Sequence, residues 1–485
     1  VYSPLRLLRG CRLLSVSAAH QAHREMPGHV VKSLEGLLGS DRLSFGAAIR
    51  EQHGRDESYH ADADGIFPPQ VVILPRSTAE VSEIVKICSH ARIPIIPSGA
   101  CTSLEGHIAA LRGGVALNMR EMNKILEVNQ EDMDVRVQAG VTRIHLNEYL
   151  RDTGLFFPID PGADASIGGM LSTRASGTNA VRYGTMRDNA LSLEAVMADG
   201  SIISTGSRAR KSSTGYDLTR LLIGSEGTLG IITEATIKLH GQPEAISAAV
   251  CEFNKLEDSV NATICIIQSG IPVARIELLD EKTCAAVKAQ SKLELEAKPT
   301  LFFEFHGSKS SVEEQAVRAG EICKDFGGSR FKWAGSAEER TTLWKARHQA
   351  YYSIIAQRPG CKGMPTDACV PISRLAECIE ETEGDMVACG LAGSILGHVG
   401  DGNFHCILVL DPNNQDEIHA AHQFAERLAR RAIRMGGTCS GEHGVGYGKL
   451  KFMEEEYGPA AIEVMRSIKK ALDPLGILNP GKMGS

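Results

Sequence analysis

Hydrophobic residues in the first half of the chain recur at β-strand spacing, with helical stretches between the strands. Residues 71–99 predict a strand, a helix that begins at a Ser77-to-Glu80 capping box, and a second, isoleucine-rich strand. Three further short strands are predicted at residues 113–119, 125–129 and 134–140. Residues 142–154 then predict a helix that ends at Gly154. Strands and helices are therefore interspersed in this half.

The pattern changes near residues 240–244, where we place a domain boundary. Just before it, an Asp-Gly pair within residues 191–205 predicts a hairpin, and residues 224–239 predict a glycine loop that leads into a β-branched strand. Beyond it, helices alternate with strands, at residues 272–279, 300–305, 311–328 and 338–357. This arrangement predicts an α+β domain with an antiparallel sheet covered by helices.

Composition adds limits to this picture. The chain has 485 residues, 43% of them apolar and 23% charged, which is typical of a globular protein with more than one core. A net charge of -7 with no dominant basic stripe argues against nucleic acid as a partner. No run of about 18 apolar residues is present, so we expect no membrane span. Thirteen cysteines without a CxxC pair indicate a reducing compartment.

The first 25 residues have a composition of their own. They contain Arg6, Arg9, Arg12 and Arg24 among serines and leucines, with no acidic residue before Glu25. This composition is typical of a mitochondrial transit peptide, which we predict for residues 1–25. The alternative is a disordered basic tail.

Three glycine-rich loops are candidates for holding a cofactor, at residues 97–106, 161–169 and 224–230. Glycine and serine allow backbone N–H groups to approach a dinucleotide pyrophosphate closely. Each loop alone is a weak signal, because glycine-rich turns are common. The Rossmann fingerprint GxGxxG does not open any strand-to-helix turn, and the segment at residues 444–450 resembles a phosphate loop only loosely. The three loops together nevertheless indicate a cofactor site in the first half.

Residues 397–405, GHVGDGNFH, carry two histidines around an Asp-Gly pair. If Asp401 and Gly402 form a two-residue hairpin turn, cross-strand partners have numbers that sum to 803, and His398 faces His405. Glu442, in the segment CSGEHGVG, offers a third ligand for zinc or another divalent transition metal. The alternative is a polar loop with ordinary hydrogen bonds, which the spacing alone slightly favours.

Arg347 lies on a predicted helix among apolar neighbours. An arginine there is more often a surface residue with a buried stem than a substrate ligand. If its side chain faces the site, the planar guanidinium could hold a carboxylate by two parallel hydrogen bonds.

Seven motifs in one order resemble a known family. They are PSGACTSLEG, PGADASIGG, RYGTMRDN, GSEGTLGIIT, GHVGDGNFH, SGEHGVG and the terminal LNPGK. Together they resemble the FAD-linked D-2-hydroxy-acid dehydrogenases of the vanillyl-alcohol oxidase and para-cresol methylhydroxylase superfamily, from about residue 60 to the C-terminus. The resemblance implies a two-subdomain FAD-binding domain at residues 60–242 and an α+β substrate cap at residues 243–440. Residues 441–485 would return to the flavin.

The resemblance also implies which residues contact FAD. The first loop would hold the pyrophosphate, and later segments would lie along the rest of the cofactor. The expected set is Pro97, Ser98, Gly99, Ala100, Cys101, Thr102, Ser103, Pro161, Gly162, Ala165, Ser166, Gly168, Gly169, Gly184, Glu226, Gly227, Gly230, Ile231, Ile232 and Asn479. Several relatives attach FAD covalently through a histidine in or near this loop. Here the first histidine is His107, so we expect noncovalent FAD.

For the substrate site, the resemblance implies that His398, His405 and Glu442 bind a divalent metal, Zn or Mn. His443 would be the base, and Arg347 would bind the substrate carboxylate. The metal would polarise the substrate hydroxyl, His443 would accept its proton, and the flavin N5 would take the Cα hydride. A carbanion route remains open.

The expected reaction is the oxidation of D-lactate, and possibly other D-2-hydroxy acids, to the 2-keto acid in the mitochondrion. Electrons would pass to an acceptor such as a respiratory electron carrier. One alternative is a dehydrogenase for D-2-hydroxyglutarate, whose second carboxylate needs another cation. Alternatives of other classes are a metal-dependent hydrolase and a flavin-binding subunit without turnover.

Overall fold

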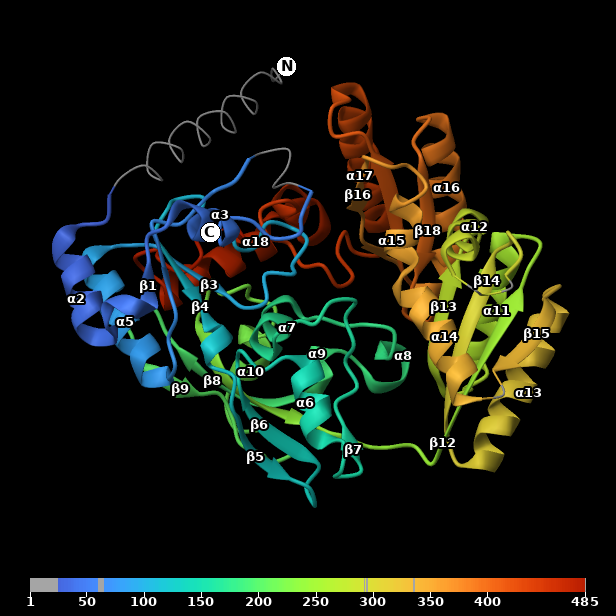
Figure 1. Ribbon diagram of the computed structural model, residues 1–485, viewed down its shortest axis with the longest axis horizontal. Helices are drawn as coiled ribbons and strands as arrows, with labels where there is room; N and C mark the ends of the chain where they lie inside the picture. Colours follow the sequence, from blue (N-terminus) through green and yellow to red (C-terminus); the bar gives the residue numbers. More distant parts are fainter. Residues whose placement is uncertain (1–24, 60–64, 292, 294, 335, 485) are drawn as a thin grey trace.

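The computed structural model describes residues 25–59, 65–291, 293, 295–334 and 336–484 (Figure 1). The predicted transit peptide lies almost wholly outside these residues. None of the described helices has the length and apolar character that crossing a bilayer requires. The described chain forms three main sheets, two of them in the first half and one in the second.

A small sheet carries the first glycine loop. Its strands are β1 (Leu43–Ser44), β2 (Val71–Ile73), β4 (Val115–Asn118) and β3 (Ile95–Ser98), in that order. Strands β2, β4 and β3 are parallel, and α5 (Thr78–Ala91) connects β2 to β3, as predicted. Ser77 caps α5 by accepting from the Glu80 N–H, but the Glu80 carboxylate accepts from Arg76, so the capping box is only half formed. The first glycine loop, residues 97–106, begins at the end of β3.

An antiparallel sheet carries the other two loops. Its strands are β5 (Ile125–Asn129), β6 (Asp134–Gln138), β10 (Ile231–Lys238), β8 (Ala190–Val196) and β9 (Ile202–Ser204), in that order. Strands β8 and β9 form the predicted Asp-Gly hairpin, with Gly200 at φ +86°. The helix α7 (Ile167–Thr173) contacts β10 and β6, and so positions the second loop beside the third.

Shorter elements complete this half. They are α2 (Gly28–Leu38), α3 (Ala47–Gln52), α6 (Arg143–Leu150), α8 (Ala180–Tyr183), α9 (Met186–Asn189), α10 (Leu218–Leu222), β7 (Leu155–Phe156) and β11 (His240–Gly241). Helix α2 packs its Leu34 against α5, and this contact extends the core around the parallel strands.

The second half is an eight-stranded antiparallel sheet with helices on both faces, which confirms the predicted antiparallel sheet covered by helices. The strands are β15 (Ser329–Ala334), β12 (Ala245–Glu252), β14 (Thr300–Gly307), β13 (Val273–Leu279), β18 (Gly393–Gly397), β19 (Asn403–Leu410) and β16 (Lys362–Pro365), with β17 (Ala368–Cys369) also paired to β19. Side chains of β14 alternate between the faces, because successive residues of a strand point to opposite sides. Phe303 and Phe305 pack on one side, and Phe302 packs on the other.

The two faces have different helices. On the side of Phe303 lie α11 (Leu256–Gln268), α13 (Lys309–Asp325), α16 (Leu375–Ala388) and α17 (Gln415–Arg434). On the side of Phe302 lie α12 (Glu281–Gln290), α14 (Ala337–His348) and α15 (Ala350–Ile355). The single helix predicted for residues 338–357 is therefore wrong in one respect, since it is interrupted at Gln349.

The end of the chain crosses back to the first half. After α18 (Met453–Leu472), Leu478 forms a bridge with Ile95 of β3, and the Asn479 N–H donates to the Ile95 carbonyl. Figure 1 shows this red segment beside the blue elements β3 and β4. The C-terminal residues thereby join the wall of the site built by the first loop.

Candidate functional site

A cavity of about 590 Å³ lies between the three glycine loops and the cap. Its volume is within the range of small-molecule and cofactor sites. From the cap it is lined by Arg347, His398, His405, Glu442 and His443. From the first half and from Asn479 of the C-terminal segment it is lined by every residue of the expected FAD set except Gly184. Segments more than 300 residues apart in sequence are thus brought to one cavity.

Gly184 does not line this cavity. It ends helix α8 with φ +75°, and its N–H donates to the Ala180 carbonyl. A Cβ at this position would lie 2.7 Å from Asp188 Oδ2. The glycine therefore serves the turn between α8 and α9, and its expected contact with the cofactor is not supported.

The loops have the features that an extended FAD molecule needs. A Cβ on Gly99 would lie 2.2 Å from Ser166 Oγ, so glycine allows the first and second loops to approach each other. The buried atoms Ser98 Oγ and Asn479 Oδ1 have no hydrogen-bond partner among the described residues. Buried polar atoms normally have partners. Unpaired polar atoms beside a cavity therefore fit a bound, polar cofactor.

The hairpin of residues 397–405 has a different register from the predicted one. Leu396, and not His398, is paired with His405, so partner numbers sum to 801. The Asp-Gly pair does not form a two-residue turn. Instead His398 to Gly402 form a longer connection, in which the Asp401 and Asn403 N–H groups donate to the His398 carbonyl. His398 has left the strand, and its ring lies at 83° to that of His405.

The three expected metal ligands nevertheless converge. Glu442 Oε1 lies 3.1 Å from His398 Nε2 and 3.1 Å from His405 Nε2. All three side chains offer a ligand atom within 4.8 Å of the others. Ser176 Oγ, from the flavin side of the cavity, donates to the second oxygen of Glu442 at 2.7 Å. The set contains two imidazoles and one carboxylate, which suits a divalent transition metal.

The Nδ1 atoms of His398 and His405, which face away from Glu442, indicate that the space between the two rings and Glu442 favours a cation. His405 Nδ1 lies 3.0 Å from the Thr366 carbonyl oxygen, which can only accept, so Nδ1 carries the proton. In the neutral ring Nε2 then has the lone pair that a metal needs, whereas a protonated ring donates from Nε2 to Glu442 Oε1 at 3.1 Å. His398 Nδ1 lies 2.7 Å from Glu277 Oε1, a histidine–carboxylate pair common behind metal ligands. A metal or a proton must therefore separate the Nε2 atoms from Glu442 Oε1.

The charges of these groups are strongly linked. Burial acts to lower the pKa of His398, but Glu277 and Glu442 outweigh it, and the pKa lies well above its usual value. Burial acts to raise the pKa of Glu442, but His398 and His405 hold it well below the usual range. The carboxylate is therefore ionised at neutral pH, as a metal ligand must be.

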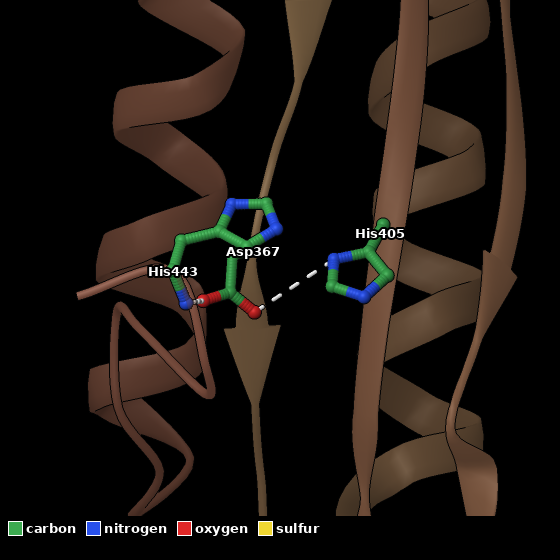
Figure 2. A group of neighbouring side chains, drawn as sticks. All are labelled: Asp367, His405 and His443. Carbon is green, nitrogen blue, oxygen red and sulfur yellow. Dashed lines mark hydrogen bonds and ion pairs between the residues drawn. The ribbon is translucent and has the colours of Figure 1, made fainter. Parts of the chain in front are cut away.

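Asp367, His405 and His443 form a second group of potential ligands (Figure 2). The rings of His405 and His443 are stacked, with centroids 5.1 Å apart and planes 5° apart. Imidazole lone pairs lie in the ring plane, so two parallel rings are poorly placed to share one ion. His405 Nδ1 also faces the Thr366 carbonyl. The set with Glu442 is therefore the better metal site.

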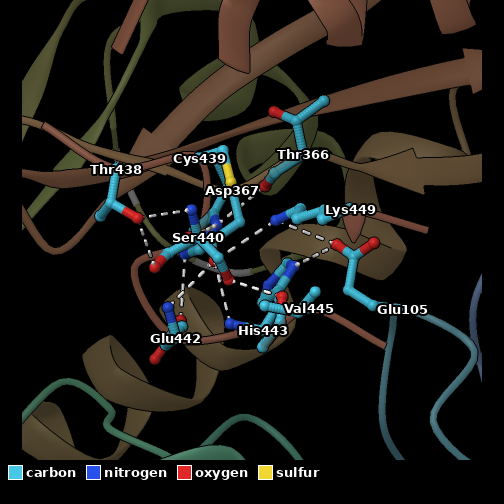
Figure 3. Close-up of polar contacts among 12 residues, drawn as sticks. Glu105, Thr366, Asp367, Thr438, Cys439, Ser440, Glu442, His443, Val445 and Lys449 are labelled. Atoms are coloured by element: carbon cyan, nitrogen blue, oxygen red, sulfur yellow. Dashed lines mark hydrogen bonds and ion pairs between the residues drawn. The ribbon is translucent and has the colours of Figure 1, made fainter. Parts of the chain in front are cut away.

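Asp367 instead holds the backbone of the loop that carries Glu442 and His443 (Figure 3). Its Oδ2 accepts from the N–H groups of Glu442 and His443, both at 2.9 Å. Burial acts to raise the pKa of Asp367, but His443 and Lys449 lower it more. Lys449 Nζ lies 3.0 Å from Glu105 Oε1 and 3.7 Å from Asp367 Oδ2. The loop is thus bound to buried acidic groups from both halves.

Arg347 is buried and lines the cavity. The interpretation of Arg347 as a surface residue with a buried stem is therefore wrong. Its Nε and Nη2 donate to Glu277 Oε2 at 3.0 and 2.6 Å. Glu277, on β13, therefore connects Arg347 with His398 through its two oxygens. Burial acts to raise the pKa of Glu277, but His398 and Arg347 outweigh this effect, and the pKa lies below its usual value.

No sequence pattern predicted a role for Glu277, Asp367 or Ser176. Glu277 had one usable signal, since it is an acidic residue within an otherwise mostly apolar predicted strand. Asp367 and Ser176 lie in short connecting segments that resemble other loops. Their importance depends on contacts with residues 75 and 266 positions away.

Comparison with known proteins agrees with this architecture. Residues 69–206 match the FAD binding domain model, and residues 242–483 match the C-terminal domain of FAD linked oxidases. The solved structure of p-cresol methylhydroxylase with substrate bound has the same fold, with a TM-score of 0.79. It covers 94% of this chain and 96% of that chain at 19% identity.

Sequence relatives are much more similar. The probable mitochondrial D-lactate dehydrogenase of Danio rerio is 55% identical over 94% of this chain and 91% of that protein. The mitochondrial D-lactate dehydrogenase (cytochrome) of Arabidopsis thaliana is 44% identical over 95% of this chain and 81% of that protein. This chain therefore belongs to the family of FAD-linked oxidases that includes the mitochondrial D-lactate dehydrogenases.

Proposed function

We propose that this protein is a mitochondrial FAD-dependent dehydrogenase that oxidises D-lactate to pyruvate. One observation supports the proposal: a single cavity is lined by the three glycine loops and by His443, Arg347, His398, His405 and Glu442. The names of the relatives supply the substrate and the organelle. Three relatives are named for a cytochrome, and we propose a carrier of that kind as the electron acceptor.

Each cavity residue has one task in this proposal. Arg347 binds the substrate carboxylate; its bonds to Glu277 use Nε and Nη2 and leave the Nη1 donors for the substrate. His443 accepts the hydroxyl proton, because its ring lines the cavity and its backbone is anchored to Asp367. When bound, the flavin takes up two electrons, and a divalent metal on His398, His405 and Glu442 lowers the pKa of the hydroxyl.

The cavity favours a monocarboxylate over D-2-hydroxyglutarate. Among the described residues that line it, Arg347 is the only arginine or lysine. Lys345 faces a separate groove, and Arg358 is bonded to Glu417 and the Val409 carbonyl. A second substrate carboxylate would be desolvated without a paired cation, which is costly. The hydrolase alternative gives no role to the flavin-binding loops that form half of the wall.

An anaerobic titration tests the proposal. D-lactate is expected to bleach the absorbance of the oxidised flavin, whereas L-lactate leaves it unchanged. In steady-state assays, kcat/KM for D-2-hydroxyglutarate is expected to be more than about tenfold lower than for D-lactate, equivalent to about 1.4 kcal/mol. Bleaching by L-lactate alone, or no bleaching by either isomer, would refute the assignment. A higher kcat/KM for D-2-hydroxyglutarate would identify that acid as the substrate.

We also propose that FAD is bound noncovalently. No histidine occurs in the first loop before His107, and the buried His107 ring lies 3.1 Å from Glu226 Oε1. Precipitation with acid is therefore expected to leave a colourless pellet and a yellow supernatant. A yellow pellet after washing would mean a covalent bond. The same acid precipitation can be applied to the Danio rerio relative, which is 55% identical, for comparison.

A further inference from the structure

Glu226 has an unusual backbone for a glutamate. It lies in the glycine-rich segment GSEGTLG, with φ +53° and only 5% of its surface exposed. Side-chain-bearing residues rarely adopt this left-handed conformation, and glycine would adopt it at no steric cost. Such strain is retained only where the surroundings demand it, and it is frequent at functional sites. The side chain of Glu226 is therefore expected to have a specific task.

The carboxylate of Glu226 is directed at the loop that carries His443. Its Oε1 accepts from the Val445 N–H at 2.7 Å, and its Oε2 accepts from the Gly446 N–H at 2.9 Å. Both oxygens are therefore used for main-chain atoms two and three residues beyond His443. Bonds from backbone N–H groups to a carboxylate are among the stronger hydrogen bonds in proteins.

The loop has little room to shift against this carboxylate. A Cβ on Gly444 would lie 2.8 Å from Glu226 Oε1 and 2.6 Å from His107 Nε2. Gly444 has φ +84° and Gly446 has φ +52°, so the chain turns sharply on each side of Val445. The backbone of the loop is thus packed against Glu226 and against His107.

The backbone of Glu226 belongs to the flavin side of the cavity. Its N–H donates to the Ser172 carbonyl on α7, and its carbonyl accepts from Asn479 Nδ2 at 2.7 Å. Glu226 and Asn479 both line the cavity. One residue thereby joins helix α7, the C-terminal segment and the His443 loop.

We propose that Glu226 is a positioning residue that sets the His443 loop against the flavin-binding loops. The proposal rests on the function proposed above, in which His443 is the base. It assigns the Glu226 carboxylate to backbone N–H groups of the loop and to the neighbouring His107 ring, although the resemblance places this residue along the cofactor. Loss of the carboxylate is therefore expected to impair turnover without loss of flavin.

The test compares Glu226→Gln with Glu234→Gln in the holoenzyme. The glutamine amide nitrogen cannot accept a hydrogen bond, so one of the two backbone N–H groups loses its partner. We expect kcat to fall by about tenfold or more, with KM changed by less than about twofold. Flavin content and the visible flavin spectrum are expected to match the parent. Glu234 is the matched control, because it lies on β10 and pairs with Arg136 away from the cavity.

Two further readouts separate positioning from a general structural role. In a His443→Asn background, Glu226→Gln is expected to add less than about a twofold loss, because the group it positions is already absent. Amide hydrogen exchange of residues 440–449 is expected to be faster in Glu226→Gln than in Glu234→Gln. If Glu226→Gln does not fold, Glu226→Asp, which keeps both oxygens one methylene shorter, replaces it in the same assays.

Results that contradict the role of Glu226 can be distinguished from results that contradict the role of His443. Loss of flavin at unchanged loop exchange would make Glu226 a cofactor ligand and overturn the proposal. Equal losses of kcat in the parent and His443→Asn backgrounds, or unchanged exchange of residues 440–449, would also overturn it. Full turnover of His443→Asn would refute the proposed base, and the exchange data alone would then decide whether Glu226 holds the loop.

Discussion

Replacing His443 with asparagine is expected to lower turnover of D-lactate by about 10²- to 10⁴-fold, the usual contribution of a general base. His443 lines the cavity, and its side chain is not one of the three converging metal ligands. Its N–H bond to Asp367 is a backbone contact and survives the substitution. Flavin and metal contents are therefore expected to remain at parental levels while the rate of flavin reduction falls in stopped-flow experiments.

The control for this experiment is His419→Asn. His419 is exposed on α17, and its Nε2 lies 2.9 Å from Gln423 Nε2 on the same helix. This variant is expected to reduce its flavin at the parental rate. If His443→Asn does so as well, His443 is not the base. If it loses the metal, the second ligand group of Figure 2 has to be reconsidered.

Replacing His405 with alanine is expected to remove the bound divalent metal and, with it, turnover. His405 Nε2 and His398 Nε2 both lie 3.1 Å from Glu442 Oε1, so one of three ligands is lost. Substitution of outer partners of metal ligands already weakens metal binding by about 10- to 100-fold, and loss of a ligand is expected to exceed this. Metal analysis of dialysed protein by mass spectrometry, with D-lactate turnover, provides the measurement.

A second pair of variants locates the metal. Glu442→Gln removes a ligand from the set with His398 and His405. Asp367→Asn removes a ligand from the set with His405 and His443, and it also alters the carboxylate that accepts from the Glu442 N–H. Metal loss in Glu442→Gln, with metal retained in Asp367→Asn, is the expected outcome. The reverse pattern would place the ion against Asp367. Retention of the metal in His405→Ala would exclude both sets, because they share this residue.

The register of residues 397–405 illustrates what a local pattern can miss. An Asp-Gly pair favours a two-residue turn, and that turn would pair His398 with His405. In the structure the pairing is shifted, and the Gly402 N–H and carbonyl are used in bonds with Val399 and Val370. The hydrogen bond from the Val370 N–H to the Gly402 carbonyl shows that packing against the segment around Val370 overrides the local preference. The two histidines still meet, but through a connecting loop and a carboxylate 37 or more residues away.

Gly184 and Glu226 also show that a sequence motif does not determine the contacts of each residue in it. Both lie in motifs of the family, and both were expected to contact the cofactor. Gly184 serves a turn between two short helices. Glu226 lines the cavity, but its carboxylate bonds to Val445 and Gly446. A motif identifies the segment that forms a site, whereas the direction of each side chain depends on what packs against it.

The sequence by itself determined the local elements and the chemistry available to this protein. Strand and helix periodicity, capping residues and glycine loops act over a few residues, so they can be read without a partner. The histidines and Glu442 were recognisable because metal binding needs those particular atoms. The tertiary structure alone decided the roles of Glu277, Asp367 and Glu226, since their contacts join segments 70 to 220 residues apart. Buried carboxylates must find partners, and only the folded chain determines which partners are within reach.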